Sequence, residues 1–236
     1  MKIIIFFLNL LDFLKKKKVI NFFKNEKVKI NSFFDVGAHN GETVTLFNRY
    51  FKIKKIYCFE ASKINYEYLV KKIKNIDNVL AFNFGLGNKE GYENFNQLEE
   101  SSSSSFIDIN TKSNYFIKKK KYLNFFFNKE LKINSSPANI KKLKNFMENN
   151  LIKFIDILKI DTEGYELNII KGAEDKIKNI NYIYFEHHFD DMLKKGYTFR
   201  EIHEYLIKNG FEKKLKLKMF FRKSFEYIYK NKNKNN

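Results

Sequence analysis

Several residue types are scarce in this chain of 236 residues, and each scarcity excludes a class of protein. There is no tryptophan, one proline (Pro137) and one cysteine (Cys58), so neither an intramolecular disulfide nor a thiolate metal cluster can form. Cys58 lies within an apolar segment, which is typical of a buried and inert thiol. We therefore expect a reducing compartment and a cytoplasmic protein.

Arginine is scarce as well, with Arg49, Arg200 and Arg222 the only three. The net charge of +18 is therefore carried almost entirely by lysine. Proteins that read phosphates and guanine rely on the guanidinium fork. A nucleic-acid partner is therefore not expected, although a lysine-rich surface attracts anions in general.

No long uninterrupted apolar run is present. Residues 1–23 are apolar but contain Asn9, Asp12 and the run Lys15–Lys18, which is too short and too interrupted a segment to span a bilayer. A small-residue cleavage site is also missing, which argues against a signal peptide. The apolar spacing predicts a helix, and we assign residues 1–30 to an N-terminal helical extension that packs on the domain. Peripheral contact with a membrane surface through its lysines is the alternative.

A glycine-containing turn follows the first expected strand, and the prediction of a binding site starts from this turn. The strand ends near Phe34, a helix opens at Glu42, and Gly37 and Gly41 lie in the turn between them. The dinucleotide fingerprint G-x-G-x-x-G is absent, because here the pattern is D-x-G-x-x-x-G. Asp35 would repel a pyrophosphate but suits the cationic amino group of S-adenosylmethionine (SAM).

An acid that ends the second strand is the expected partner of a ribose, and Glu60 occupies that position. The turn and this acid together favour SAM over NAD. The predicted cofactor-binding residues are Asp35, Gly37, Ala38, His39, Asn40, Gly41, Glu60, Ala61 and Gly85.

Strands and helices alternate along much of the chain, which predicts βαβ units and a parallel sheet. After the first strand, the expected strands are one that ends at Glu60 and those over Val79–Phe84, Phe154–Asp161 and Tyr182–His187. The helices between the strands are expected over Glu42–Tyr50, Lys63–Lys74, 140–148 and 165–177. After a helix over Phe199–Asn209, the segments Phe211–Phe220 and Phe225–Tyr229 should form an antiparallel hairpin. The expected fold is α/β and Rossmann-like, the class I SAM-dependent methyltransferase fold, with a mostly parallel seven-stranded sheet over residues 31–236.

The periodicity fails between residues 88 and 140, which contain the run Ser101–Ser105 and the cluster Lys118–Lys121. A long segment without regular structure inside a domain is typical of an active-site lid or a substrate loop. We predict such a lid, with a disordered insert as the alternative.

Four segments resemble the FkbM family of SAM-dependent methyltransferases: residues 34–42, Phe59-Glu60-Ala61, the serine run with Phe106, and Leu158-Lys159-Ile160-Asp161-Thr162-Glu163-Gly164-Tyr165-Glu166. The last is the most specific, and the similarity covers residues 32–211. The resemblance implies an O-methyltransferase that acts on a hydroxyl of a sugar, a glycan or a glycan-linked metabolite.

Candidate catalytic residues follow the fourth and fifth strands. Asp161 and Glu163 lie at the edge marked by Gly37 and Glu60, where they could orient the cofactor or the acceptor and hold the acceptor hydroxyl. His187 or His188 is the predicted general base, and strand alternation should bring only one of them to the pocket. The cluster Glu186-His187-His188, with Asp190 and Asp191 just beyond it, resembles a set of metal ligands. Adjacent residues cannot all converge on one ion, so no metal is expected.

Two other functions stay open, a ribose 2′-O-methyltransferase acting on RNA and a binding module that keeps the SAM fold without catalysis. Amino-methylating DNA enzymes are excluded, because they need two adjacent prolines in their catalytic loop. Cytosine-C5 enzymes are excluded too, because they need a cysteine after the fourth strand and Cys58 lies in the second.

Overall fold

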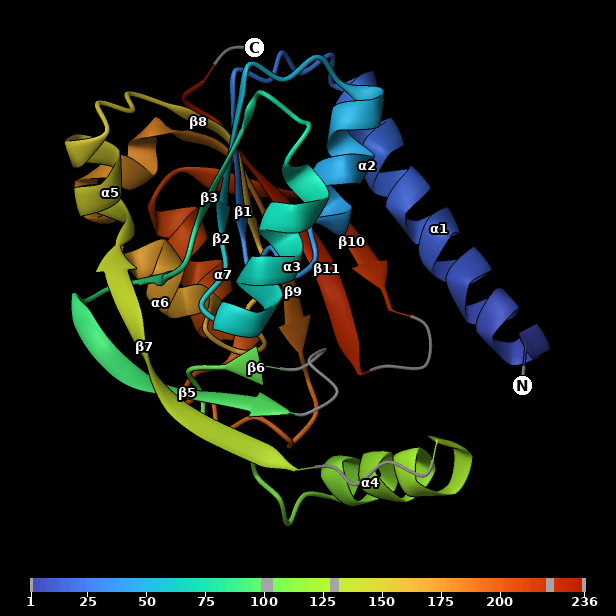
Figure 1. The fold of residues 1–236 in the computed structure, drawn as a ribbon. Helices are drawn as coiled ribbons and strands as arrows, with labels where there is room; N and C mark the ends of the chain where they lie inside the picture. Colours follow the sequence, from blue (N-terminus) through green and yellow to red (C-terminus); the bar gives the residue numbers. More distant parts are fainter. Residues whose placement is uncertain (1, 99–103, 128–131, 220–222, 235–236) are drawn as a thin grey trace.

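The computed structural model describes residues 2–98, 104–127, 132–219 and 223–234, and its centre is a seven-stranded sheet (Figure 1). The strand order is β10-β11-β9-β8-β1-β2-β3. Five of these strands pair in parallel: β1 (Ser32–Val36), β2 (Lys55–Phe59), β3 (Val79–Phe82), β8 (Ile155–Ile160) and β9 (Ile180–His188). The hairpin of β10 (Phe211–Lys218) and β11 (Ser224–Asn231) adds antiparallel to β9. The predicted fold class is confirmed.

Two layers of helices cover the two faces of this sheet. One layer consists of α1 (Lys2–Asn25), α2 (Glu42–Tyr50) and α3 (Lys63–Ile73). The other layer consists of α5 (Leu143–Asn149), α6 (Glu166–Lys171) and α7 (Phe199–Lys208). Successive side chains of a strand point to opposite faces, and Phe33 and Phe34 show this directly. Phe33 stacks on Phe47 of α2 with ring centroids 4.7 Å apart, whereas Phe34 lies edge-on to Phe146 of α5.

The segment 88–140 is built differently from the prediction. It forms most of a second sheet with the order β4-β7-β5-β6, together with helix α4 (Asn114–Phe127), and this sheet lies across the carboxyl ends of the main strands (Figure 1). Its strands are β4 (Gly85–Gly87), β5 (Gly91–Leu98), β6 (Ser104–Ser105) and β7 (Ile133–Lys142). Ser101–Ser103 lie outside the described residues.

The prediction of an irregular segment failed because the pairing is not local. β5 and β7 pair antiparallel from Gly91↔Ile140 to Leu98↔Ile133, across the whole of β6 and α4. Pro137 is tolerated because β4 pairs only with residues 140–142, which leaves β7 an unpaired edge at the proline. Gly85–Gly87, which follows β3 in the chain, belongs to this second sheet.

The helix predicted over residues 165–177 is also interrupted. α6 ends at Lys171 and a 3₁₀ helix follows at Glu174–Asn179. The chain needs a glycine between them, because a Cβ on Gly172 would lie 1.8 Å from the carbonyl oxygen of Gly87. α6 therefore packs directly on the backbone of β4, which joins the two sheets.

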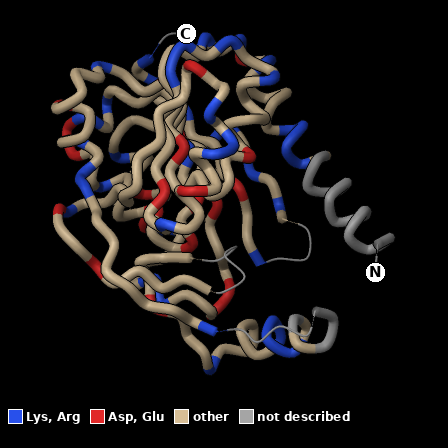
Figure 2. Tube along the Cα trace, viewed as in Figure 1, with Lys and Arg blue, Asp and Glu red and all other residues tan. Residues whose placement is uncertain are grey.

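The N-terminal helix α1 packs on the domain through its last turns. Val19, Ile20 and Phe23 are buried in the core beside α2. Lys15 is buried too, whereas Lys17 and Lys18 are exposed. Among the described residues, no helix combines the length and the apolar character that crossing a membrane requires. Figure 2 shows lysine and arginine spread over all parts of the fold rather than gathered on one side.

Candidate active site

The glycine turn after β1 is held in a shape that needs its glycines. Gly37 has φ 77°, and a Cβ there would lie 2.0 Å from the carbonyl oxygen of Asp161. The amide groups of Gly37 and Ala38 both donate to the carbonyl of Phe59, at 2.9 and 3.1 Å. The turn is thereby pressed between β2 and β8, beside the point where the order of the parallel strands reverses. In open α/β sheets, this is the place where ligands bind.

Glu60 connects the glycine turn to the turn that follows β2. Its Oε2 accepts a hydrogen bond from the amide of His39 at 2.8 Å, and its Oε1 accepts one from the amide of Ser62 at 2.9 Å. Burial raises the pKa of Glu60 to about 7, although both hydrogen bonds act to lower it. A carboxylate has about four lone-pair sites, so two remain for a ligand hydroxyl.

A buried lysine connects two of the predicted acids. Lys159 Nζ lies 3.0 Å from Asp35 Oδ1 and 3.4 Å from Asp161 Oδ2. Burial disfavours a charged lysine, but the two carboxylates outweigh this and raise its pKa. Burial also raises the pKa of Asp35, with Lys159 opposing it. At Asp161 burial acts in the same direction, yet Lys159 and His188 prevail and lower the pKa.

The geometry corrects the role predicted for Asp35. Its side chain is 0% exposed and does not line the cleft, whereas the side chain of Asp161 is 40% exposed and does. Asp161 is therefore the carboxylate available to a cationic ligand group, and Asp35 positions it through Lys159. In the register of β1 and β8, Asp35 lies directly opposite Lys159, which explains the pairing.

The turn after β8 presents a second acid to the cleft. Glu163 has a positive φ of 50° and is followed by Gly164 with φ 96°. Ser105 Oγ of β6 lies 2.7 Å from the carbonyl oxygen of Glu163, so the second sheet holds this turn. Glu166 also holds this turn, because its carboxylate accepts hydrogen bonds from the amide of Gly164 at 2.8 Å and from Tyr197 Oη at 2.6 Å.

The two histidines face opposite sides of β9, as strand alternation predicts, but neither lines the cleft. His187 packs among the rings of Phe189, Tyr197 and Phe199, with Nδ1 3.9 Å from Glu166. It therefore has no access to an acceptor.

His188 lies behind Glu163, with Nε2 3.2 Å from Glu163 Oε2 and 3.4 Å from Glu186 Oε1, and Nδ1 3.4 Å from Asp190 Oδ2. Burial would lower the pKa of His188, but these carboxylates outweigh it and raise the pKa to about 10. An imidazole that is already protonated at neutral pH cannot take a proton. His187 is enclosed by aromatic rings and His188 is enclosed by three carboxylates outside the cleft lining, so the structure does not support either histidine as the general base.

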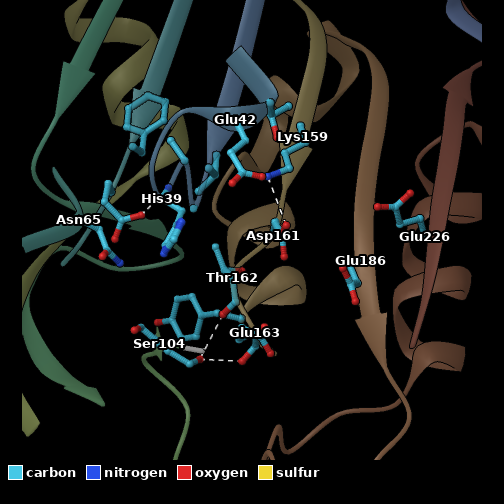
Figure 3. Close-up of a pocket in the computed structure, with 18 of the residues that line it drawn as sticks. His39, Glu42, Asn65, Ser104, Lys159, Asp161, Thr162, Glu163, Glu186 and Glu226 are labelled. Carbon is cyan, nitrogen blue, oxygen red and sulfur yellow. Dashed lines mark hydrogen bonds and ion pairs between the residues drawn. The ribbon is translucent and has the colours of Figure 1, made fainter. Parts of the chain in front are cut away.

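A cleft of about 1040 Å³ joins these elements, a volume that can hold a cofactor together with an acceptor (Figure 3). Of the residues predicted from the sequence, Gly37, Ala38, His39, Glu60, Ala61, Gly85, Asp161 and Glu163 line it, and Asp35, Asn40, Gly41, His187 and His188 do not. Asn40 and Gly41 shape the turn, and a Cβ on Gly41 would lie 2.8 Å from Leu69 of α3.

The sequence analysis missed several residues that line the cleft. They are Lys15, Asn65, Leu86, Phe106, Lys159, Tyr165, Tyr184, Glu186 and Glu226, together with residues of α4. Lys159 carried a signal, because a lysine inside a buried strand must find a buried partner. Glu226 carried none, since its neighbours are brought together only by the pairing of β9 with β11.

Four carboxylates gather at one end of the cleft. Asp161 and Glu163 follow β8, Glu186 lies on β9 and Glu226 lies opposite it on β11, and all four line the cleft (Figure 3); we call this group the acidic floor. Glu226 pairs with Lys15 of α1 at 3.1 Å, and burial raises its pKa although Lys15 opposes this.

Residues 35–213 match the family model described as Methyltransferase FkbM domain. No match was found among curated proteins. The structure is similar to that of a methyltransferase FkbM from Methylobacillus flagellatus, with a TM-score of 0.54 and 13% identity. That alignment covers 85% of this chain and 44% of the other, so this chain spans less than half of that protein.

Two further solved structures show the same fold. A protein from Pyrococcus horikoshii, proposed to be an RNA methyltransferase, has a TM-score of 0.50 at 11% identity, with 92% of this chain and 84% of that chain covered. A protein of the NADB-Rossmann superfamily from Streptococcus agalactiae has a TM-score of 0.51 at 13% identity, with 94% and 69% covered. At these identities, the likeness shows the fold alone.

Proposed function

Because this chain belongs to the methyltransferase FkbM domain family of SAM-dependent enzymes, we propose that its cleft binds SAM and methylates a hydroxyl of a sugar, a glycan or a glycan-linked metabolite. The observation that carries the proposal is that acids from two different strands converge on one cleft. Glu60 follows β2, Asp161 follows β8, and the glycine turn lies between them.

The residues present fit the three parts of SAM. Glu60 would accept hydrogen bonds from the ribose hydroxyls through its two remaining lone-pair sites. Asp161 would face the cationic methionine end, beside Gly37, and its lowered pKa keeps it charged. The apolar residues near Gly85, among them Leu86 and Phe106, would cover the adenine.

SAM supplies a methyl group that is already activated on a sulfonium, so the protein has to position the acceptor, remove its proton and exclude water. Positioning alone can contribute roughly 7–11 kcal/mol to lowering the barrier. Glu163 would accept a hydrogen bond from the acceptor hydroxyl and then take its proton. General-base catalysis of this kind typically raises the rate by roughly 10²–10⁴-fold. The ion pair with His188 at 3.2 Å holds the Glu163 carboxylate in one orientation.

Calorimetry with SAM tests the cofactor half of the proposal. Glu60→Ala should weaken SAM binding by about 1.5–3 kcal/mol, the range for a hydrogen bond to a charged group. Glu67→Ala, on the exposed side of α3, is the matched control and should bind like the wild type. Equal affinity of all three proteins would remove the central claim.

The acceptor half is tested with isotope-labelled SAM and cell extract of the source organism, followed by separation into small metabolite, glycan, lipid, RNA and protein fractions. We expect label in sugar-containing material. Label confined to RNA would identify a ribose methyltransferase instead. A protein that binds SAM but transfers no label to any fraction would be a binding module.

A further inference from the structure

Helix α4 presents one of its sides to the cleft. Tyr115, Lys118, Lys119 and Tyr122 line it, and their spacing of three and four residues places them on one helical face, here called the cleft face of α4. Lys120 and Lys121 lie on another face, beside a separate cavity of about 550 Å³. The helix sequence, Asn114–Phe127, contains four lysines and no acid.

The cleft therefore has opposite charges at two places. The acidic floor supplies Asp161, Glu163, Glu186 and Glu226, which Lys15, Lys159 and His188 partly balance from within the fold. The cleft face of α4 supplies two lysines between two tyrosines and no acid. Figure 2 shows the lysines along α4, set apart from the acidic segments at the ends of the central strands. A ligand that fills the cleft should match this separation, with hydroxyls against the carboxylates and an anion against the lysines.

We propose that the methyl acceptor is an anionic sugar, whose hydroxyl reaches the acidic floor while a phosphate or carboxylate on the far side of the sugar binds Lys118 and Lys119. This rests on the proposed function and names its substrate class. Tyr115 and Tyr122 offer apolar ring surface beside the lysines, on which a sugar ring or an attached base can lie.

The same charge separation disfavours RNA. The 2′-hydroxyl of a ribose is attached next to a carbon that carries a phosphodiester, so placing that hydroxyl beside Glu163 would bring the phosphate to the carboxylate end of the cleft and away from the lysines of α4. In a glycosyl phosphate or a nucleotide sugar, the ring itself separates the phosphate from the distant hydroxyls. An acceptor with its anionic group on the far side of the sugar from the reacting hydroxyl satisfies both ends of the cleft, and RNA does not.

The first test uses the wild-type protein, labelled SAM and a metabolite extract that anion exchange has divided into neutral, small anionic and RNA pools. Label should enter the small anionic pool. Loss of retention after phosphatase or mild acid identifies a phosphate, and resistance to both identifies a carboxylate. Label in neutral sugars alone overturns this inference and leaves the proposed function standing. Label in RNA, or no SAM binding by calorimetry, refutes both.

The second test compares two double variants on the same helix. Lys118→Gln with Lys119→Gln should raise the KM for the labelled anionic acceptor by about tenfold, with SAM affinity unchanged as evidence of an intact fold. Lys120→Gln with Lys121→Gln removes the same charge from a face that does not line the cleft, and should keep the wild-type KM. Equal effects of the two double variants would show that the lysines of α4 attract anions only in a general way, and would refute the proposed anion subsite.

Discussion

The charge state of His188 can be measured through the pH dependence of stability. The three carboxylates around it raise its pKa from 6.5 to about 10. Below pH 6.5, the folded and unfolded states both hold this proton, and the stabilisation is fully present. As the pH rises from 6.5 towards 10, the unfolded chain releases the proton while the folded protein keeps it, so stability is lost.

The magnitude follows from the same shift. Each unit of pKa difference corresponds to about 1.4 kcal/mol, so the His188 contribution to the free energy of unfolding should fall by roughly 2–3 kcal/mol between pH 7 and pH 9. A loss of about 2–3 kcal/mol would be a large part of the stability of one domain.

Urea denaturation of the wild type and of His188→Gln at pH 7, 8 and 9 is the assay. The variant should lack the His188 part of the slope, so the difference between the two free energies of unfolding should shrink as the pH rises. His203→Gln, which removes a histidine outside the carboxylate cluster, is the control and should follow the wild type. Parallel curves for wild type and His188→Gln would refute the protonated state and restore His188 as a candidate base.

Three further outcomes follow from the site. Glu163→Gln should lower kcat by about 10²-fold or more and leave SAM affinity within about twofold, measured by turnover and calorimetry; equal loss of both would contradict its role at the acceptor. Gly37→Ala should destabilise the fold by at least about 1–3 kcal/mol in urea denaturation, because its Cβ would clash with the Asp161 carbonyl at positive φ. Lys159→Met should lower the free energy of unfolding by about 3–5 kcal/mol, because it leaves the buried Asp35 carboxylate unpaired. Adding Asp35→Leu should restore part of that stability in the same urea denaturation; no recovery would mean that the unpaired carboxylate does not cause the loss.

Local patterns in the sequence were enough to predict the main sheet. Strands that alternate with helices at short spacing form βαβ units, whose strands pair in parallel. The last two extended segments are close enough in the sequence to form an antiparallel hairpin. The site at Gly37, Glu60, Asp161 and Glu163 follows from the same reasoning, since the carboxyl ends of neighbouring parallel strands meet at one edge.

What the sequence could not determine depends on contacts between distant residues. β5 and β7 pair across the segment that carries β6 and α4, so their polar composition resembled a loop. The register of β1 against β8 sets Asp35 opposite Lys159, and this withdraws Asp35 from the cleft.

His188 shows the same limit in electrostatic terms. Its own segment suggested a base near neutral pKa, but Glu163 reaches it from the turn after β8 and Asp190 from the loop after β9. The sequence determined which ionisable groups stand at the edge of the sheet, because strand ends can be read locally. Only the tertiary structure decided which of them are charged and which face the cleft, because burial and the distance between charges are properties of the packed molecule.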